Sequence, residues 1–230
     1  MQLIYEGKTK DVYELDDHHV RLFFKDDMTG KDGKFDPGEN QKGLTVEGAG
    51  QSGLALSTYF FHLLEDKGIK THFVDANIEE HTMDVKKASY FGNGIEFICR
   101  FKSTGSFMRR YGDYAAEGQD IPGLVEITLK DDERGDPFIS KQTLSVLNIL
   151  NEQDYDDLVE QTTLISNLIK EELKQHDLEL YDIKLEFGRA VETNELILID
   201  EISGGNMRVY KDNQLIHPLD LNQYILEENN

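Results

Sequence analysis

Three charged side chains alternate with apolar residues in the segment YDIKLEFGR, which begins at Tyr181. Asp182, Lys184 and Glu186 are each separated from the next by a single apolar residue. Successive side chains of a β-strand point to opposite faces, so this period of two predicts a strand with all three charges on one face. The pattern is equally typical of an ordinary amphipathic strand with a solvent-exposed polar face.

A second acidic group follows the next apolar run. The segment ELILIDEIS ends with Asp200 and Glu201, and the turn-forming residues 192–194 precede it. A hairpin in this region could bring the two acids beside Glu186, although the sequence does not fix the register. Carboxylates at the ends of adjacent strands, with Arg208 nearby, suit a magnesium ion that carries polyphosphate.

A basic stretch interrupts this acidic chain. Residues 97–112 contain no Asp or Glu, although the whole chain has 45, and they include Arg100, Lys102, Arg109 and Arg110. Hydroxyl residues and a glycine precede a predicted helix start at Ser106, so a helix N-terminus and arginines could bind a phosphate there. A basic helical turn that pairs with neighbouring acids is the alternative.

Two lysines lie in the glycine turn GKTK, Gly7 to Lys10, between two predicted strands. Lys8 and Lys10 could reach a phosphate chain lying over the sheet. The turn lacks the spacing of a P-loop, and surface lysines at a turn would explain it equally well.

Composition excludes several classes of function. With 45 acidic and 24 basic residues the formal net charge is -21, which opposes binding to nucleic acid or to an anionic membrane. Cys99 is the single cysteine, so no disulfide within the chain is possible, and we expect a buried, inert thiol. The seven histidines form no HxH or HExxH pair, which makes a zinc site improbable. Charges near the N-terminus and the lack of a long apolar run predict a cytoplasmic protein.

The remaining pattern predicts alternating sheets and helices. Short strands are expected within residues 3–24, followed by a solvated loop at 25–33 and a long mobile loop between Gly30 and Gly53. Further expected elements are a helix at 51–67, strands at 71–74, 81–87, 94–101 and 124–132, and a helix at 152–176 whose apolar stripe contains Tyr155, Leu158, Thr162, Ile165 and Leu168. We place a boundary near Gly92, giving an N-terminal sheet domain (1–92) and a C-terminal domain (93–230).

Together, the lysine turn, the basic stretch and the carboxylates indicate a nucleotide-dependent ligase or kinase. The same motifs identify a resemblance. In order, YEGKTKDVY, KDDMTGKDG, ICRFKSTGSFMRRYG, LVEITLKDDERGDPFIS and YDIKLEFGR with IDEIS resemble the conserved segments of the SAICAR synthetase (phosphoribosylaminoimidazole-succinocarboxamide synthase) family of purine biosynthesis.

The resemblance implies an α+β fold with a kinase-like N-terminal antiparallel sheet lobe, an α/β C-terminal lobe, and ATP between them. It also implies a C–N bond-forming ligase that uses ATP and Mg²⁺ to join L-aspartate to carboxyaminoimidazole ribonucleotide (CAIR), through an acyl phosphate, to give SAICAR, ADP and phosphate. A homodimer is possible for such an enzyme.

The resemblance also assigns roles to individual residues of this chain. ATP and its magnesium complex would be bound by Lys8, Lys10, Val12, Lys87, Glu186 and Asp200, of which Glu186 and Asp200 would hold the metal. The phosphorylated ribonucleotide would be bound by Arg100, Ser106, Lys130 and Arg208, and the catalytic residues would be Asp32, Lys184 and Arg208.

Some substrate-side positions depart from the family pattern. Phe101 stands where the family has asparagine, Ala49 lies in an altered glycine-rich segment, Gly204 and Gly205 replace a proline and an acid, and a C-terminal KDxFR segment is missing. These departures leave three hypotheses: the purine enzyme, a paralogous ATP-dependent ligase with a different carboxylate or amine substrate, and a non-catalytic nucleotide-binding relative.

Overall fold

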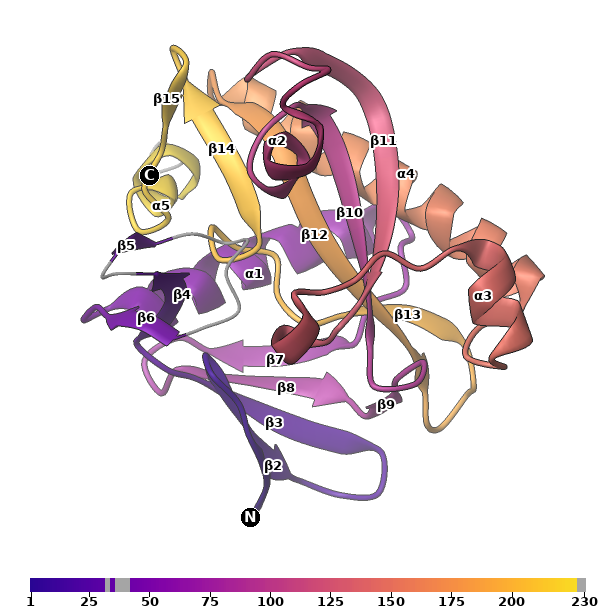
Figure 1. Cartoon of the computed structure of the whole chain (residues 1–230). Coiled ribbons are helices and arrows are strands. Elements are labelled where there is room, and N and C mark those ends of the chain that lie inside the picture. The colour runs from indigo at the N-terminus through magenta and orange to yellow at the C-terminus, as the bar shows by residue number, and fades with distance from the viewer. Residues whose placement is uncertain (32–33, 36–41, 227–230) are drawn as a thin grey trace. The chain divides into compact units, whose positions relative to one another are not determined.

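The computed structural model describes residues 1–31, 34–35 and 42–226, and it divides into two compact units (Figure 1). The first unit contains residues 1–89, 188–206 and 217–230, and the second contains residues 90–187 and 207–216. Strand β12 (Glu179–Ala190) runs through both units, because its last three residues belong to the first. The division into domains 1–92 and 93–230 stays a prediction from the sequence.

A five-stranded antiparallel sheet forms the centre of the first unit. Its strand order is β1 (Gln2–Glu6), β2 (Lys10–Glu14), β3 (His19–Phe24), β8 (Thr82–Lys86) and β7 (Phe73–Asn77). In β3 the side chains of Val20, Leu22 and Phe24 are buried and alternate with half-buried ones, as expected for a strand with one covered face. The strands predicted in residues 3–24 are confirmed.

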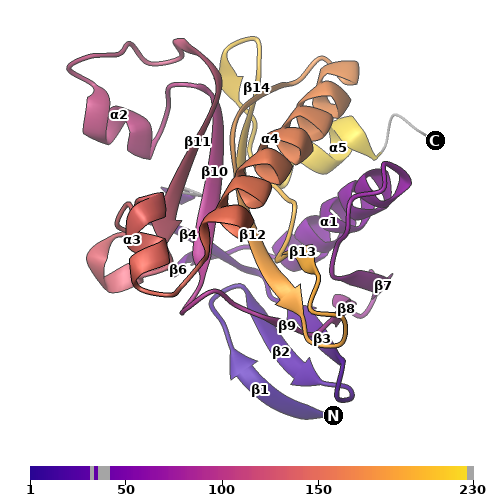
Figure 2. The same ribbon diagram turned by 90° about the vertical axis from the view of Figure 1, so that its right-hand side faces the viewer.

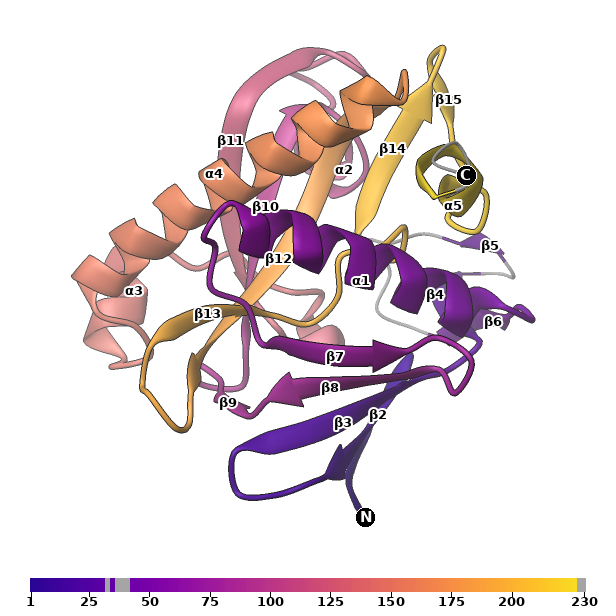
Figure 3. The same cartoon turned by 180° about the vertical axis from the view of Figure 1, so that it is seen from behind.

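Helix α1 (Ala49–Asp66) covers this sheet and contacts β3 and β7 (Figure 3). Its buried side includes Leu54, Phe60, Phe61 and Leu64, which recur at helical spacing. The helix begins two residues before the predicted start at Gln51, directly after Gly48, whose φ of 84° is a conformation that favours glycine.

The segment predicted as a loop contains strands, so that expectation is wrong. Strands β4 (Asp27–Lys31), β5 (Lys34–Phe35) and β6 (Lys42–Thr45) form a small sheet in which β4 pairs with both neighbours. Met28 is buried, and the Asp26 carboxylate accepts a hydrogen bond from the Gly50 N–H at 2.9 Å. The polar composition of the segment conceals strands that are held by pairing rather than by an apolar face.

The predicted hairpin of β12 with β13 (Leu196–Ile199) is confirmed, since the two strands pair. Its turn is closed by the Ala190 N–H bonding to the Glu195 carbonyl at 2.9 Å, with Asn194 at a φ of 59°. Strand β9 (Ala88–Ser89) also pairs with β12, and Ala88 packs on a small core of Ala190, Ile197 and Ile199.

The second unit is built on an antiparallel path β11–β10–β12–β14–β15, with β10 (Ile95–Lys102), β11 (Asp120–Leu129), β14 (Met207–Lys211) and β15 (Gln214–Leu215). Helix α4 (Glu152–Gln175) packs on β10 and β11 (Figure 2). Leu158, Thr162 and Ile165 are buried as predicted, and the stripe continues through Ile169 and Leu173 rather than Leu168. The Cys99 side chain is buried, and burial raises the pKa of its thiol.

Shorter helical segments complete the described chain: α2 (Ser106–Tyr111), a 3-10 turn (Asp132–Arg134), α3 (Lys141–Val146) and α5 (Leu221–Ile225). None of the described helices is long and apolar enough to cross a membrane. The predicted α+β class with antiparallel sheets is confirmed.

Gly50 allows α1 to approach the end of β3. A Cβ at this position would lie 2.6 Å from the Phe24 carbonyl oxygen and 2.9 Å from that of Lys25. We therefore expect Gly50→Ala to lower the free energy of unfolding by roughly 1–3 kcal/mol, measured by urea denaturation, because backbone atoms must shift. Gln51→Ala, at an exposed position of the same helix, should change it by less than about 0.5 kcal/mol. Equal stability of the two variants would contradict the close approach.

Candidate active site

In the first unit, Lys10 joins the start of β2 to the acidic pair that follows β13. Its Nζ atom lies 3.1 Å from Asp200 Oδ1 and 2.5 Å from Glu201 Oε1. The Lys10 side chain is 13% exposed. Burial opposes its charged form, but the charges and hydrogen bonds of the two carboxylates outweigh burial and raise the pKa of Lys10. The cluster is therefore a shielded pairing of one ammonium with two carboxylates.

The loop that carries the two acids is fixed by its own hydrogen bonds. Ser203 Oγ donates to Glu201 Oε2 at 2.6 Å and accepts from the Gly205 N–H at 2.9 Å. The side chain of Asn206 accepts from the Ser203 N–H and donates to the Glu201 carbonyl. Asp200 has a φ of 67°, a left-handed conformation that costs energy outside glycine and often occurs at functional sites.

The loop is also attached to helix α1. Ser57 Oγ accepts from the Ile202 N–H at 3.2 Å and lies 3.3 Å from its carbonyl oxygen. Gly53, one turn earlier, faces the same loop, since a Cβ there would lie 3.4 Å from Glu201 Oε2. The acidic pair is thus positioned by a strand and a helix that lie far from it in sequence.

His72 adds a buried imidazole to this region. The side chain is 4% exposed and contacts the Phe61 ring edge-on at 5.3 Å between centroids. Burial lowers the pKa of His72 to about 4, an effect that the Asp200 charge and a hydrogen bond to the Asp200 backbone partly oppose. No motif in the sequence marks this histidine.

The other predicted nucleotide-side residues lie in the first unit apart from Glu186. Lys8 is exposed in the glycine turn, Val12 is half-buried in β2, and Lys87 pairs with Glu14 at 3.3 Å. The turn itself is tight, because the Gly7 N–H bonds to the Lys10 carbonyl at 2.9 Å. Asp32, predicted to be catalytic, lies outside the described residues.

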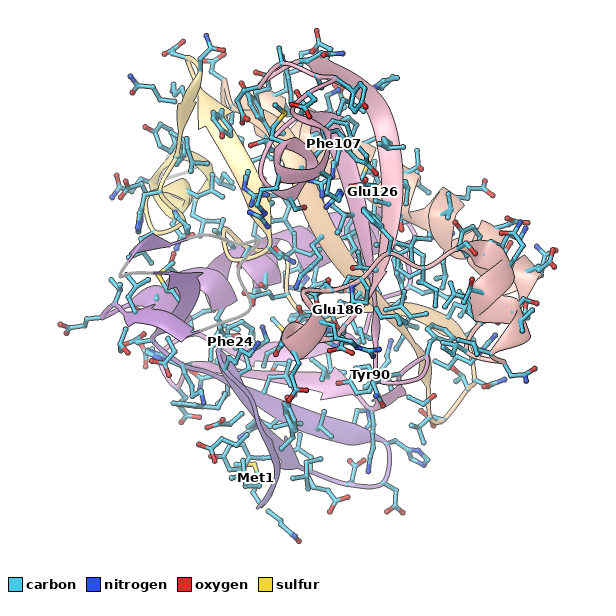
Figure 4. All side chains as sticks on the ribbon, viewed as in Figure 1. Met1, Phe24, Tyr90, Phe107, Glu126 and Glu186 are labelled. Carbon is cyan, nitrogen blue, oxygen red and sulfur yellow. The ribbon has the colours of Figure 1, made fainter. Side chains whose placement is uncertain are left out.

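In the second unit, Arg100 lies at the centre of the basic stretch and is 1% exposed. Its guanidinium donates to Glu126 at 2.5 Å, to Asp182 at 2.7 Å and to Ser106 at 2.8 Å. Glu126 and Phe107 of this region are labelled in Figure 4. The acids come from strands β11 and β12, so the sheet, rather than neighbouring residues in the sequence, supplies the counter-charges.

Arg208 and Arg110 extend the same cluster. Arg208 donates to Asp182 at 2.8 Å, and Arg110 donates to Glu126 at 2.7 Å. A Cβ on Gly105, whose φ is 54°, would lie 2.6 Å from the Arg208 guanidinium carbon, so only glycine leaves room for that side chain. Glu126 and Asp182 thus each accept hydrogen bonds from two guanidinium groups. Clustered guanidinium groups are suited to binding an anion.

Glu186 belongs to a second buried ionic group on β12. Its carboxylate accepts from Lys130 Nζ at 2.7 and 2.9 Å, and Lys184 Nζ lies 3.9 Å away. Lys184 also donates to Glu96 at 2.9 Å, while Thr128 donates to the other oxygen of Glu96. The alternative prediction, that the polar face of β12 is exposed to solvent, is wrong, because Asp182 and Glu186 are each only 3% exposed.

Phe101 lies on the other face of β10 from Arg100. Its ring is covered by Lys170 of α4, with 4.3 Å between Nζ and the ring centroid, and it is 6% exposed. Alternation along the strand places this side chain in the core under α4. The Phe101 ring therefore lies away from the Arg100 guanidinium.

His72 should make stability depend on pH. The folded imidazole stays neutral down to about pH 4, whereas the unfolded one takes up a proton near pH 6.5. The unfolded state then binds more protons, so the stability falls as the pH drops from 6.5 to 4, by roughly 3 kcal/mol in total.

Urea denaturation at several pH values measures this effect. His72→Gln should remove that part of the pH dependence, because glutamine does not titrate, while His18→Gln at an exposed position should retain it. The same pH profile in wild type and His72→Gln would show that His72 does not titrate as described.

Comparison with known proteins identifies the family. A family model described as SAICAR synthetase matches residues 3–223. A phosphoribosylaminoimidazole-succinocarboxamide synthase of Clostridium tetani is 56% identical over 227 residues, covering 99% of this chain and 100% of the relative. The Thermotoga maritima enzyme of the same name is 38% identical over 212 residues, covering 92% of this chain and 86% of its own.

Solved structures agree with the sequence matches. The phosphoribosylaminoimidazole-succinocarboxamide synthase of Ehrlichia chaffeensis is 30% identical, with a TM-score of 0.83, and the match covers 100% of this chain and 93% of the other. A Type-2 SAICAR synthetase in complex with ADP is also 30% identical, with a TM-score of 0.82, covering 98% of this chain and 91% of the other. The chain belongs to the SAICAR synthetase family.

Proposed function

We propose that this chain joins L-aspartate to the carboxylate of CAIR with ATP, giving SAICAR, ADP and phosphate. The observation that carries the proposal is the 56% identity to the Clostridium tetani enzyme over the full length of both chains. The chain is accordingly a C–N bond-forming ligase of purine biosynthesis. We place the reaction in the cytoplasm and leave a homodimer as the possible assembly.

The ATP phosphates are assigned to the lysine turn of the first unit. Lys10 is held by two carboxylates with its charge retained, and Lys8 is exposed in the same turn. A charged, pre-positioned ammonium is suited to phosphate oxygens. Val12 and Lys87 would complete the nucleotide contacts, and the solved relative in complex with ADP supports a nucleotide site in this family.

Magnesium is assigned to Asp200 and Glu186, because carboxylate oxygens are the protein ligands that the ion prefers. Each of these carboxylates already holds a lysine ammonium, Lys10 or Lys130, so each position accommodates positive charge. When bound, the ion would neutralise part of the phosphate charge. Within the described chain, no group of three or more His, Cys, Asp or Glu residues is placed to hold a metal ion.

The phosphorylated ribonucleotide is assigned to the basic cluster of the second unit. Arg208 and Ser106 would contact the phosphate, and Lys130 would contact the substrate elsewhere. Arg100 is almost fully buried and donates to Glu126, Asp182 and Ser106, so in binding the substrate it would fix Ser106 and supply positive charge. The gathering of three guanidinium groups beside Ser106 and two carboxylates supports the assignment.

In the proposed reaction, the CAIR carboxylate takes the γ-phosphoryl group of ATP and ADP leaves. The amine of L-aspartate then attacks the acyl phosphate, the new C–N bond forms, and phosphate departs. Lys184, Arg208 and Asp32 are proposed to stabilise or orient the reacting groups. For Lys184, its contact with buried Glu96 supports a fixed ammonium on the same strand as Glu186.

The direct test measures ADP release by the purified chain with ATP, Mg²⁺, CAIR and L-aspartate, each omitted in turn. SAICAR formation that requires all of them is expected. ADP release without L-aspartate, or amide formation with another amine at a higher kcat/KM, would point to a different ligase.

Arg208→Ala tests the substrate-phosphate site. A hydrogen bond to a charged group contributes about 1.5–3 kcal/mol, so the KM for CAIR should rise roughly 10- to 150-fold while the KM for ATP stays almost unchanged. The steady-state kinetics should be compared with Arg134→Ala, which removes an exposed arginine of the same unit. A parallel rise in both KM values would contradict the assignment.

A further inference from the structure

We infer that Glu201 is a positioning residue that fixes the Lys10 ammonium for the ATP phosphates, while Asp200 is left for the nucleotide–metal complex. This inference rests on the proposed function of Lys10. It assigns separate roles to two adjacent acids that follow β13.

The two oxygens of the Glu201 carboxylate have different partners. Oε1 accepts from Lys10 at 2.5 Å, and Oε2 accepts from Ser203 Oγ at 2.6 Å. Ser203 Oγ in turn accepts from the Gly205 N–H at 2.9 Å. A continuous chain of hydrogen bonds therefore runs from the backbone of the loop to the lysine ammonium, and it fixes the rotation of the carboxylate.

Two glycines, Gly53 and Gly205, lie beside the Glu201 carboxylate. A Cβ on Gly205 would lie 3.1 Å from Ser203 Oγ and 3.6 Å from Glu201 Oε2, and a Cβ on Gly53 of α1 would lie 3.4 Å from the same oxygen. The Glu201 side chain is 14% exposed. The carboxylate thus lies beside two backbone positions where glycine leaves room for it.

Asp200 is more exposed than Glu201 and lies farther from the Lys10 ammonium. Its side chain is 22% exposed, its contact with Lys10 is longer at 3.1 Å, and its backbone has a φ of 67°. The shorter contact and the fixed orientation make Glu201 the anchor of Lys10. Because Lys10 lies 191 positions away in sequence, this anchor also ties β2 to the loop after β13.

The test shortens the anchor without changing its charge. Glu201→Asp keeps the negative charge but withdraws the carboxylate by one methylene, so it can no longer reach both Lys10 and Ser203. ADP affinity, measured by calorimetry in the presence of Mg²⁺, should fall about tenfold, since a misplaced ammonium loses roughly one charged hydrogen bond. Ser203→Ala, which frees Oε2 and changes no charge, should weaken ADP binding in the same direction.

The matched control is Glu195→Asp, which shortens the partner of Lys70 in an exposed ion pair of the same unit. Its ADP affinity should stay within about twofold of wild type. In a Lys10→Ala background, Glu201→Asp should have no further effect on ADP affinity, because its target is absent.

The outcomes separate the inference from the proposed function. If Lys10→Ala leaves ADP affinity unchanged, the proposed role of Lys10 fails. If Lys10→Ala weakens ADP binding but Glu201→Asp does not, or if the two effects are additive, Glu201 is not its anchor. Steady-state kinetics distinguish positioning from a general loss of folded structure. If Glu201 positions Lys10, Glu201→Asp should raise the KM for ATP and leave the KM for L-aspartate unchanged.

Discussion

The need to compensate buried charge governs both candidate clusters of this chain. An ionised side chain removed from water costs several kcal/mol unless an opposite charge and hydrogen bonds accompany it. In the second unit, Asp182 holds two guanidinium groups and Glu186 holds an ammonium, and both acids are 3% exposed. Such pairing contributes little to the stability of the fold, but it fixes the orientation of the side chains. If one member moves away, its partners are left buried without an opposite charge. A site of this kind is positioned before its substrate arrives.

The counter-charges come from segments that are distant in sequence, which makes the sheets responsible for the geometry. Arg100 on β10 meets Glu126 on β11 and Asp182 on β12 because the three strands are neighbours in one antiparallel sheet. The Lys10 cluster of the first unit follows the same logic, with β2 supplying the cation and the loop after β13 supplying the acids. Strand pairing therefore determines which charges are available for chemistry.

Sequence periodicity was sufficient to predict the helices and strands that have an apolar face. The alternation in β12 and the stripe of α4 predicted these elements nearly to their ends, and the basic stretch marked the cluster around Arg100. Sequence periodicity could not predict three other features, each for a physical reason. The strands β4 to β6 are polar and held by pairing, so they lack a periodic signal. The burial of the β12 charges depends on partners from other strands. His72 becomes a buried neutral imidazole because its burial, which includes packing on Phe61, outweighs the opposing charge of Asp200.

The glycines that depart from the family pattern have a steric explanation in the first unit. A Cβ on Gly204 would lie 2.7 Å from both Cα and Cβ of Pro218, so a proline ring at position 204 would require the backbone of the C-terminal segment to move. A side chain on Gly205 would press against Ser203 Oγ, the atom that orients Glu201. Pro218 thus occupies the space beside the loop that a residue 204 side chain would need. Glycine at positions 204 and 205 therefore leaves room both for Pro218 and for the Ser203 hydroxyl that orients Glu201.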